Sequence, residues 1–209
     1  MTSERNQKKI NFDNYADNYK EHINKSFASF ENNLSYYHIK KSEIVKKELG
    51  YQPKKILDLG CGIGTMLELL SKQFPDSAFY AQDESKKSMD YIKKNYPKVN
   101  CLANLNTTEK FDLIFLSNVI HHVKSSERDG LFKIIYNLLN PDGKLFIFEH
   151  NPYNPLTLQL VANCEFDADA ELIKKKDLIK VCEKNNLKIF KSGYIHFFPS
   201  KLGFLFKLE

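Results

Sequence analysis

The segment that most constrains this chain is a glycine-rich run at residues 56–70, which reads ILDLGCGIGTMLELL. Aliphatic residues surround Asp58. After it, Gly60, Gly62 and Gly64 alternate with other residues, and an amphipathic pattern follows. Glycine permits a sharp strand-to-helix turn and lets a ligand approach bare backbone where a Cβ would collide. The run therefore predicts a buried strand, a ligand-binding turn and a helix, with Gly62 and Gly64 as the tightest positions.

The spacing of the glycines distinguishes two classes of ligand. A dinucleotide-binding turn reads GxGxxG and places a pyrophosphate at the helix N-terminus. This run reads GxGxG instead, and Asp58 stands two residues before the first glycine. A carboxylate there suits a cationic amino-acid moiety, which a pyrophosphate does not need. A glycine turn that binds no ligand is the alternative interpretation.

A second acid lies about 20 residues after the glycines, where Asp83 ends a β-rich run in FYAQDES. A carboxylate at a strand end can accept hydrogen bonds from both hydroxyls of a ribose. Capping the helix that begins near Lys86 is the competing role for this polar segment, and Asp83 and Ser85 can divide the two roles. The acid and the glycines together predict a bound cofactor.

Short β-rich runs alternate along the chain with segments of helical periodicity. The β-rich runs lie at residues 55–59, 78–82, 99–102, 111–116, 144–149 and 188–198. Two helices, at residues 12–25 and 36–49, are expected before the first strand. This order predicts an α/β fold, a Rossmann-like doubly wound and mostly parallel sheet in three α/β/α layers. We expect one globular unit, with an N-terminal helical lid at residues 1–50 and a cofactor-binding core at residues 51–209.

The composition fits a globular protein and excludes several classes of function. The chain has 209 residues, 42% of them hydrophobic and 27% charged, which are ordinary values. Its net charge of +5 is scattered, without the basic stripe of nucleic-acid-binding proteins. No apolar run is long enough to span a membrane, and the N-terminus shows no secretory signal. We expect a cytoplasmic protein with no nucleic-acid partner.

The four cysteines are far apart and have no histidine partners at zinc spacing. They are therefore predicted to be reduced thiols, and no metal site is expected.

The motifs together resemble those of class I S-adenosylmethionine-dependent methyltransferases over about residues 10–198. The matching segments are DLGCGIGT, AQDES, FDLIFLSNVIHHV, LLNPDGKLFIFEH and NFDNYADNY. The resemblance implies S-adenosylmethionine as the cofactor and S-adenosylhomocysteine as the product. It also implies that the NFDNYADNY segment folds over the cofactor.

The resemblance implies a set of cofactor contacts: Asp58, Gly60, Cys61, Gly62, Gly64, Asp83, Glu84, Asn104, Ser117, Tyr15 and Tyr19. Gly60, Cys61 and Gly62 are expected to line the methionine part, with Asp58 near its amino group. Asp83 is expected to hold the ribose. Asn104 is expected at the adenine, and Ser117 begins the loop beside the sulfonium. Tyr15 and Tyr19 lie four residues apart on one helical face and are expected to close over the cofactor. Core packing of the lid is the alternative role for the two tyrosines.

Two features depart from the family pattern. Ala81 stands where the family usually has a glycine, two residues before the ribose acid. The family fold ends with an antiparallel hairpin, whereas this chain stops at Glu209, so the end is truncated or residues 202–208 supply the seventh strand. A missing strand would leave a sheet edge uncovered. We therefore expect a monomer or a homodimer.

Acid–base chemistry depends on residues outside the cofactor motifs. Methyl transfer is an in-line displacement that mainly needs a well-positioned nucleophile. A base is required where the acceptor must lose a proton, and His122, Glu149 and His150 lie on the expected carboxyl edge of the sheet. Satisfying loop backbone groups is the alternative role for the histidines, and His121 is expected to tune the same loop.

The acceptor pocket is predicted from the segment EHNPYNPLT, in which two Asn-Pro steps bias the backbone away from helix. With FDADAELI and YIHFFPS, this segment resembles a subgroup of the family found in cell-surface glycan and nucleotide-sugar pathways. The resemblance implies O-methylation of a sugar or another small polar metabolite. The aromatic stretch at residues 194–206 fits a lipid-linked acceptor equally well.

Three classes of function follow, and a small-molecule methyltransferase is preferred. An RNA or protein methyltransferase is disfavoured by the modest charge and by SNVI at residues 117–120, where base methyltransferases carry an NPPY-type tetrapeptide. A non-catalytic binding module is the third class, and the intact glycine and ribose positions argue against it.

Overall fold

The computed structural model describes residues 10, 12–14 and 34–195. Its sheet has five strands in the order β3-β2-β1-β4-β5, and every pairing is parallel. The strands are β1 (Lys55–Leu59), β2 (Ala78–Gln82), β3 (Asn100–Cys101), β4 (Phe111–Ser117) and β5 (Leu139–Phe148). The predicted doubly wound, parallel α/β fold is confirmed.

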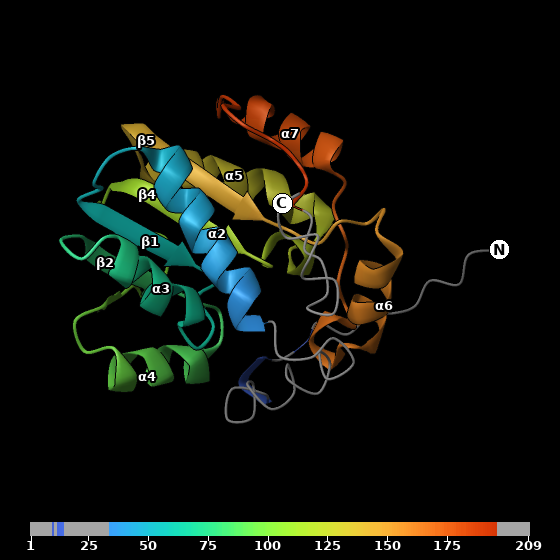
Figure 1. Cartoon of the computed structure of the whole chain (residues 1–209), viewed down its shortest axis with the longest axis horizontal. Helices are drawn as coiled ribbons and strands as arrows, with labels where there is room; N and C mark the ends of the chain where they lie inside the picture. Colours follow the sequence, from blue (N-terminus) through green and yellow to red (C-terminus); the bar gives the residue numbers. More distant parts are fainter. Residues whose placement is uncertain (1–9, 11, 15–33, 196–209) are drawn as a thin grey trace.

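Helices cover both faces of this sheet (Figure 1). They are α2 (Leu34–Leu49), α3 (Thr65–Gln73), α4 (Lys86–Asn95), α5 (Ser125–Leu138), α6 (Pro155–Asn163) and α7 (Lys175–Lys184). The short 3-10 helices are η1 (Phe12–Asn14), η3 (Ile120–His122) and η4 (Glu165–Asp167). One apolar cluster joins α2, α3 and α4 to the sheet, and a second joins α5 and α7 to the opposite face. The chain therefore has the three layers that the sequence predicts.

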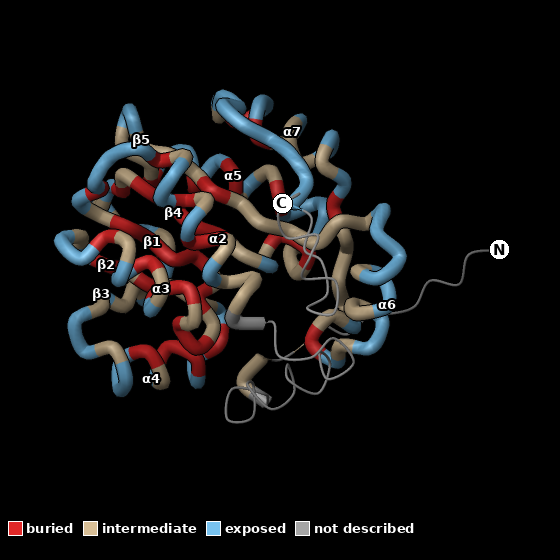
Figure 2. Tube along the Cα trace, in the orientation of Figure 1, coloured by how far each residue is buried: buried red, intermediate tan, exposed pale blue. Residues whose placement is uncertain are grey.

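The central strands are buried on both sides, which explains their nearly continuous apolar sequence. Ile56 of β1 belongs to the first apolar cluster, and its neighbour Leu57 belongs to the second. In β4, Phe115 and Leu116 divide between the two clusters in the same way, because successive side chains point to opposite faces. Figure 2 shows buried residues along these strands, whereas α6 has none.

Helix α2 packs on the sheet layer. Val45 and Leu49 are fully or almost fully buried in the first apolar cluster, and Lys144 of β5 donates hydrogen bonds to the carbonyls of Glu48 and Leu49. The division of the chain at residue 50 into lid and core stays a prediction. Residues 15–25, with Tyr15 and Tyr19, lie outside the described part, and so do residues 202–208.

The predicted strand at residues 188–198 is wrong over its described part, because residues 188–195 form no strand. These residues are all exposed, so they have no buried face that would favour strand pairing. The segment contacts β5 through side chains instead. The ring of Phe190 packs edge-on against Phe146 at 5.6 Å, and Lys191 forms an ion pair with Glu48 of α2.

No helix among the described residues combines the length and the apolar character that crossing a membrane requires.

Candidate active site

The carboxyl ends of the parallel strands meet at one edge of the sheet, where ligands of such folds bind. The glycine turn follows β1, Asp83 follows β2, η3 lies just beyond β4, and Glu149 follows β5. Neighbouring strands thus bring the predicted cofactor residues and the predicted catalytic residues to one edge.

The glycine turn is held by the neighbouring strand. The N–H groups of Gly60 and Cys61 donate to the carbonyl of Gln82 at 2.8 and 3.2 Å. Gly60, Gly62 and Gly64 have φ angles of +74°, +52° and +84°, a left-handed conformation that favours glycine. These three positions shape the turn through their backbone conformation.

The space differs among the three glycines. A Cβ on Gly60 would lie 2.4 Å from a methyl group of Val119, and one on Gly64 would lie 2.8 Å from Ile92. A Cβ on Gly62 would meet nothing within 4 Å among the described residues. Tight packing is therefore confirmed at Gly64, whereas close approach of a ligand to Gly62 stays a prediction. Val119 packs onto Gly60, and Gly62 borders open space.

Asp58 is buried in β1, where the residue is 2% exposed. Its Oδ2 atom has no hydrogen-bond partner among the described residues. Burial, helped by the charge of Asp83, raises the pKa of Asp58 to about 8. An ammonium group beside this carboxylate would supply the missing partner and charge. The site thus fits the amino-acid moiety of S-adenosylmethionine.

Asp83 anchors the turn after β2. Its Oδ2 accepts the N–H of Gly62 and its Oδ1 accepts the N–H of Ser85, both at 2.8 Å. Burial raises the pKa of Asp83, against the effect of these two hydrogen bonds. Each oxygen keeps a second acceptor position for a ribose hydroxyl. Ser85 caps α4 by accepting the N–H of Ser88, so the capping role belongs to Ser85, and the ribose role of Asp83 stays a prediction.

Other predicted cofactor residues have varied surroundings. Cys61 is buried, which raises the pKa of its thiol. Glu84 and Asn104 are exposed, and the side chain of Asn104 accepts the N–H of Asn106 in a local turn. Ser117 ends β4 and accepts a hydrogen bond from Lys41 at 2.7 Å. The assignment of these residues to the cofactor stays a prediction.

Lys41 of α2 is a residue that sequence analysis missed. It is 8% exposed, and burial lowers the pKa of its ammonium to about 8 despite the charge of nearby Glu149. The signal was available in the sequence, because Lys41, Val45 and Leu49 are spaced four residues apart on one helical face. A lysine on the buried face of a helix at this edge contacts the site.

The predicted catalytic residues gather around His121, which is 1% exposed. Its Nδ1 lies 2.6 Å from Oε2 of Glu149, and its Nε2 lies 3.3 Å from Oδ1 of Asp167. Burial opposes the charged imidazolium, but the hydrogen bonds to Asp167 and Glu149 outweigh it and raise the pKa of His121 to about 9. His121 is thus the centre of the cluster, in addition to its predicted place in the loop.

Glu149 fixes the loop that follows β4. Its Oε1 accepts the N–H groups of Val119 and Ile120 at 2.9 and 2.6 Å, while Oε2 contacts His121. Burial works against ionisation, yet the interactions with His121 and with the two backbone N–H groups hold the pKa of Glu149 below its usual value. Glu149 is therefore an ionised, fully engaged acceptor.

His122 and His150 both lie near the carboxylate of Asp167. Nε2 of His122 lies 3.5 Å from Asp167, Nδ1 of His122 lies 3.3 Å from Asp169, and Nε2 of His150 lies 3.9 Å from Asp167. Burial, followed by the charge of His121, lowers the pKa of His122 and lowers that of His150 to about 4. Asp167 and Asp169 belong to the FDADAELI segment, which the sequence analysis connected with the acceptor without singling out these acids.

Helix η1 contacts both parts of the site. The ring of Phe12 packs edge-on against His122 at 4.9 Å. Asp13 accepts a hydrogen bond from the hydroxyl of Ser85 at 2.7 Å, next to Asp83. The N–H of Ile10 donates to Asp169 at 2.8 Å. The described part of the NFDNYADNY segment therefore reaches from the start of α4 to the histidine cluster.

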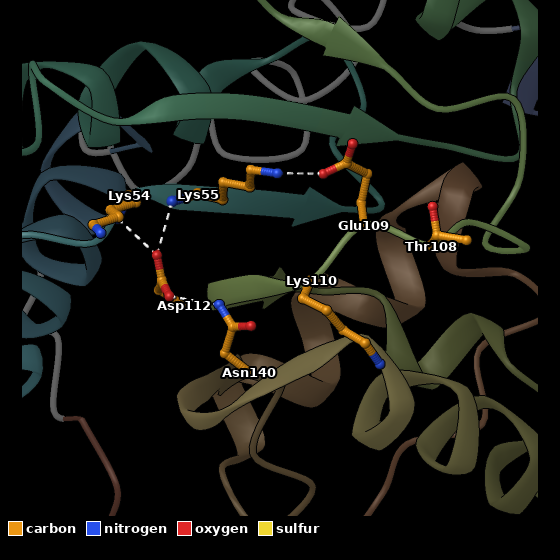
Figure 3. Close-up of a pocket in the computed structure, with 7 residues that line it drawn as sticks. All are labelled: Lys54, Lys55, Thr108, Glu109, Lys110, Asp112 and Asn140. Atoms are coloured by element: carbon orange, nitrogen blue, oxygen red, sulfur yellow. Dashed lines mark hydrogen bonds and ion pairs between the residues drawn. The ribbon is translucent and has the colours of Figure 1, made fainter.

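A polar pocket of about 320 Å³ lies at the opposite, amino-terminal edge of the sheet (Figure 3). Its carboxylates are engaged in holding the strand starts together. Asp112 accepts the N–H groups of Lys54 and Lys55 and a hydrogen bond from Asn140, and Glu109 pairs with Lys55. Because the glycine turn and Asp83 are at the other edge, this pocket is not the candidate active site.

A parallel sheet in the order 3-2-1-4-5, with a glycine turn after β1 and a buried acid after β2, defines a nucleotide-cofactor-binding α/β protein. A family model described as a methyltransferase domain matches residues 35–192. The chain therefore belongs to the methyltransferase-domain family, and its prediction as a class I S-adenosylmethionine-dependent methyltransferase is confirmed.

Individual relatives are distant. A ubiquinone biosynthesis O-methyltransferase of Coxiella burnetii is 24% identical over 180 residues, covering 77% of this chain and 74% of the relative. An uncharacterized protein of Rickettsia prowazekii is 32% identical over an alignment of 103 residues that covers 44% of this chain and 41% of that protein. A solved O-methyltransferase family protein from Burkholderia thailandensis is 17% identical with a TM-score of 0.69, covering 91% of this chain and 62% of its own. At that identity the structural likeness shows the fold.

Proposed function

We propose that this protein transfers a methyl group from S-adenosylmethionine to an oxygen atom of a small-molecule acceptor, either a sugar or a lipid-linked metabolite. The observation that carries the proposal is the direct connection between the cofactor turn and the histidine cluster. The side chain of Val119 packs onto Gly60, while the N–H of Val119 is held by Glu149. A nucleophile positioned by the cluster therefore lies close to the cofactor.

The buried acids and open backbone assign the cofactor. Asp58 holds the ammonium group, the backbone of Gly60, Cys61 and Gly62 borders the methionine part, and Asp83 with Glu84 holds the ribose. When bound, S-adenosylmethionine supplies an electrophilic methyl carbon. Two features of the residues that the structure describes support this arrangement: Oδ2 of Asp58 has no hydrogen-bond partner among them, and none of them lies within 4 Å of a Cβ placed on Gly62.

The remaining cofactor contacts complete the proposal. Gly64 begins the helix behind the turn, Asn104 touches the adenine, and Ser117 stands beside the sulfonium. Tyr15 and Tyr19 belong to the segment that covers the cofactor. The contacts of η1 with Ser85 and His122 support such a cover, because they carry the chain across the carboxyl edge.

The histidine cluster prepares the acceptor. Glu149 holds His121 and the loop after β4, which presents His122 to the same space as His150. An imidazole at this place takes the proton of an acceptor hydroxyl while the oxygen attacks in line with the departing sulfur. An oxygen acceptor is supported by the Coxiella relative, whose name is that of an O-methyltransferase.

The proposed partner is a small-molecule acceptor. The protein is proposed to act in the cytoplasm as a monomer or homodimer without a nucleic-acid partner. The dispersed net charge of +5 supports this proposal.

Calorimetric titration with S-adenosylmethionine, and separately with NAD, tests the cofactor. Incubation with methyl-labelled S-adenosylmethionine and sets of sugars, nucleotide sugars and lipid-linked phenols then tests the acceptor. His122→Gln should slow labelled product formation about 100-fold or more while cofactor affinity is retained. Binding of NAD alone, or binding of neither compound, would overturn the cofactor assignment. Equal rates for His122→Gln, His150→Gln and the unchanged protein would remove the histidines from catalysis.

A further inference from the structure

Three separate segments bring imidazoles and carboxylates to one point. Helix η3 supplies His121 and His122, the segment after β5 supplies His150, and η4 supplies Asp167. The ring of His121 lies 4.1 Å from that of His122 and 4.9 Å from that of His150. The proposed function uses an imidazole of this cluster as a base, but it assigns no role to Asp167 or to the convergence of His121 and His150 on that carboxylate.

The geometry of three of these residues suits a metal ion. One ligand atom each of His121, His150 and Asp167 lies within 4.8 Å of the others. Nε2 of His121 is 3.3 Å from one oxygen of Asp167, and Nε2 of His150 is 3.9 Å from the other. Ligands bound at about 2.0 to 2.2 Å lie roughly 3 to 4 Å apart. Small side-chain rotations therefore suffice to close the three groups around an ion.

The surrounding hydrogen bonds orient the imidazole of His121 for this role. Glu149 engages Nδ1 at 2.6 Å and is itself fixed by two backbone N–H groups, which directs Nε2 toward Asp167. A carboxylate behind a histidine is the usual second layer of a protein metal site, because it sets the tautomer and the orientation of the ring. Glu149 supplies that layer here.

Charge and access agree with a bound cation. The cluster contains three largely buried carboxylates, those of Glu149, Asp167 and Asp169. Lys41 carries a buried ammonium near Glu149, and with His121 as a neutral ligand a divalent cation together with Lys41 would balance the three negative charges. The side chain of His121 is 1% exposed and that of His150 is 21% exposed. His121 is thus enclosed, whereas His150 keeps partial contact with solvent.

We propose that His121, His150 and Asp167 bind one divalent first-row transition-metal ion such as Zn²⁺, Mn²⁺ or Co²⁺. Two imidazoles and one carboxylate suit this class of ion and leave coordination positions open. The metal site replaces the sequence-based expectation of no metal. Its role, which rests on the proposed function, is to hold an oxygen of the acceptor beside the cofactor, with His122 as the neighbouring proton acceptor.

Metal binding is testable without cofactor or acceptor. The chain is treated with a chelator, dialysed and titrated with Zn²⁺ by calorimetry and with Co²⁺ by visible absorption. We expect one ion per chain with micromolar or tighter affinity, and Co²⁺ bands of a site with nitrogen and oxygen ligands. Asp167→Asn and His150→Gln should weaken binding at least 100-fold, and Glu149→Gln should weaken it about 10- to 100-fold.

Two matched variants serve as controls. Asp129→Asn changes a carboxylate that pairs with Lys184 on α7, and His38→Gln changes a histidine of α2 that is not a proposed ligand. Both should bind the ions as the unchanged chain does. Circular dichroism of each variant identifies loss of fold, and Co²⁺ spectra of the folded variants report the ligand set directly.

The outcomes separate this proposal from the proposed function. No Zn²⁺ or Co²⁺ binding by a chain that binds S-adenosylmethionine would overturn the metal site alone. Binding that survives both Asp167→Asn and His150→Gln would also overturn it. Ion binding that these variants abolish, in a chain that fails to bind S-adenosylmethionine, would support the metal site and contradict the proposed function.

Discussion

The two parts of the candidate active site are built differently. The cofactor part comes from residues 58–85, and its shape depends on backbone: left-handed glycines, N–H groups and one helix cap. The histidine cluster depends on side chains from three segments between residues 121 and 169. A backbone-built site leaves a compact sequence motif, whereas a side-chain-built site has no fixed spacing along the chain.

The two parts of the site also differ in the pKa of their buried acids. Asp58 and Glu149 are both withdrawn from water, but burial raises the pKa of Asp58, whereas interactions with His121 and backbone N–H groups lower that of Glu149. Burial alone therefore does not decide the charge of a carboxyl group; its partners do. Within the described part of the chain, Asp58 lacks a hydrogen-bond partner at Oδ2, and Glu149 has several partners.

The largest expected effect concerns the histidine cluster. In the metal-free chain, Glu149→Gln leaves the His121 imidazolium beside a neutral amide with Asp167 as its remaining carboxylate, and breaking a buried pair of this kind costs about 3 to 5 kcal/mol of unfolding free energy. Urea denaturation near pH 7 measures the loss. Glu109→Gln, which breaks the more exposed pair with Lys55, should cost less than about 1 kcal/mol. Similar losses for the two variants would contradict the difference in burial.

In the cofactor turn, we expect substitution of Gly60 to affect mainly stability and substitution of Gly62 to affect mainly cofactor affinity. Gly60→Ala requires a left-handed alanine and collides with Val119, so we expect a loss of about 2 to 4 kcal/mol of unfolding free energy. Gly62→Ala meets open space and should cost about 1 to 2 kcal/mol, from backbone conformation alone. Denaturation and calorimetry together should show the greater stability loss for Gly60 and a clear affinity loss for Gly62. The reverse order of stability would contradict this packing.

Asp83 should matter chiefly for the cofactor. Asp83→Ala removes its charge-assisted hydrogen bonding to the ribose, and a net loss equal to one such bond, roughly 1.5 to 3 kcal/mol, weakens S-adenosylmethionine binding about 10- to 150-fold. Titration calorimetry measures this change. Asp90→Ala on the exposed face of α4 is the matched control and should leave the affinity unchanged. Equal affinities for Asp83→Ala and the unchanged protein would remove Asp83 from the site.

The smallest expected effect is a dependence of stability on pH. The folded-state pKa of Asp58, about 8, exceeds the value of an unfolded aspartate, so the folded chain retains this proton to higher pH. The stabilisation is complete below about pH 4 and is lost as the pH rises through 8. Between pH 7 and pH 8 the loss is about 1 kcal/mol.

Thermal unfolding of the unchanged chain and of Asp58→Asn measures this pH-dependent stabilisation as the difference between their pH profiles. The stability of the unchanged chain should decline relative to the variant as the pH rises from 6 to 8. Saturating S-adenosylmethionine should remove the decline, because its ammonium group compensates the carboxylate. Parallel profiles without cofactor would show that Asp58 does not titrate in this range.

Much of the fold was predictable because its signals are local. The boundaries of β1 and β2 agree with the sequence prediction, since apolar runs bounded by polar turns identify buried parallel strands. The segment at residues 188–195 misled the same method: its β-rich composition is that of a strand, but all of its residues are exposed in the described part of the chain. Periodicity describes which side chains can share a face, and only packing decides whether that face is covered.

The sequence by itself determined the family, the parallel α/β architecture and the glycine turn with its two acids, because each depends on residues close together in the chain. Tertiary structure decided that Val119 fills the space above Gly60, that Lys41 reaches Ser117, and that His121 meets Asp167. Those contacts join residues 46 to 76 positions apart. How close these residues lie depends on the pairing of strands β1, β4 and β5 in the sheet, which no local sequence spacing encodes.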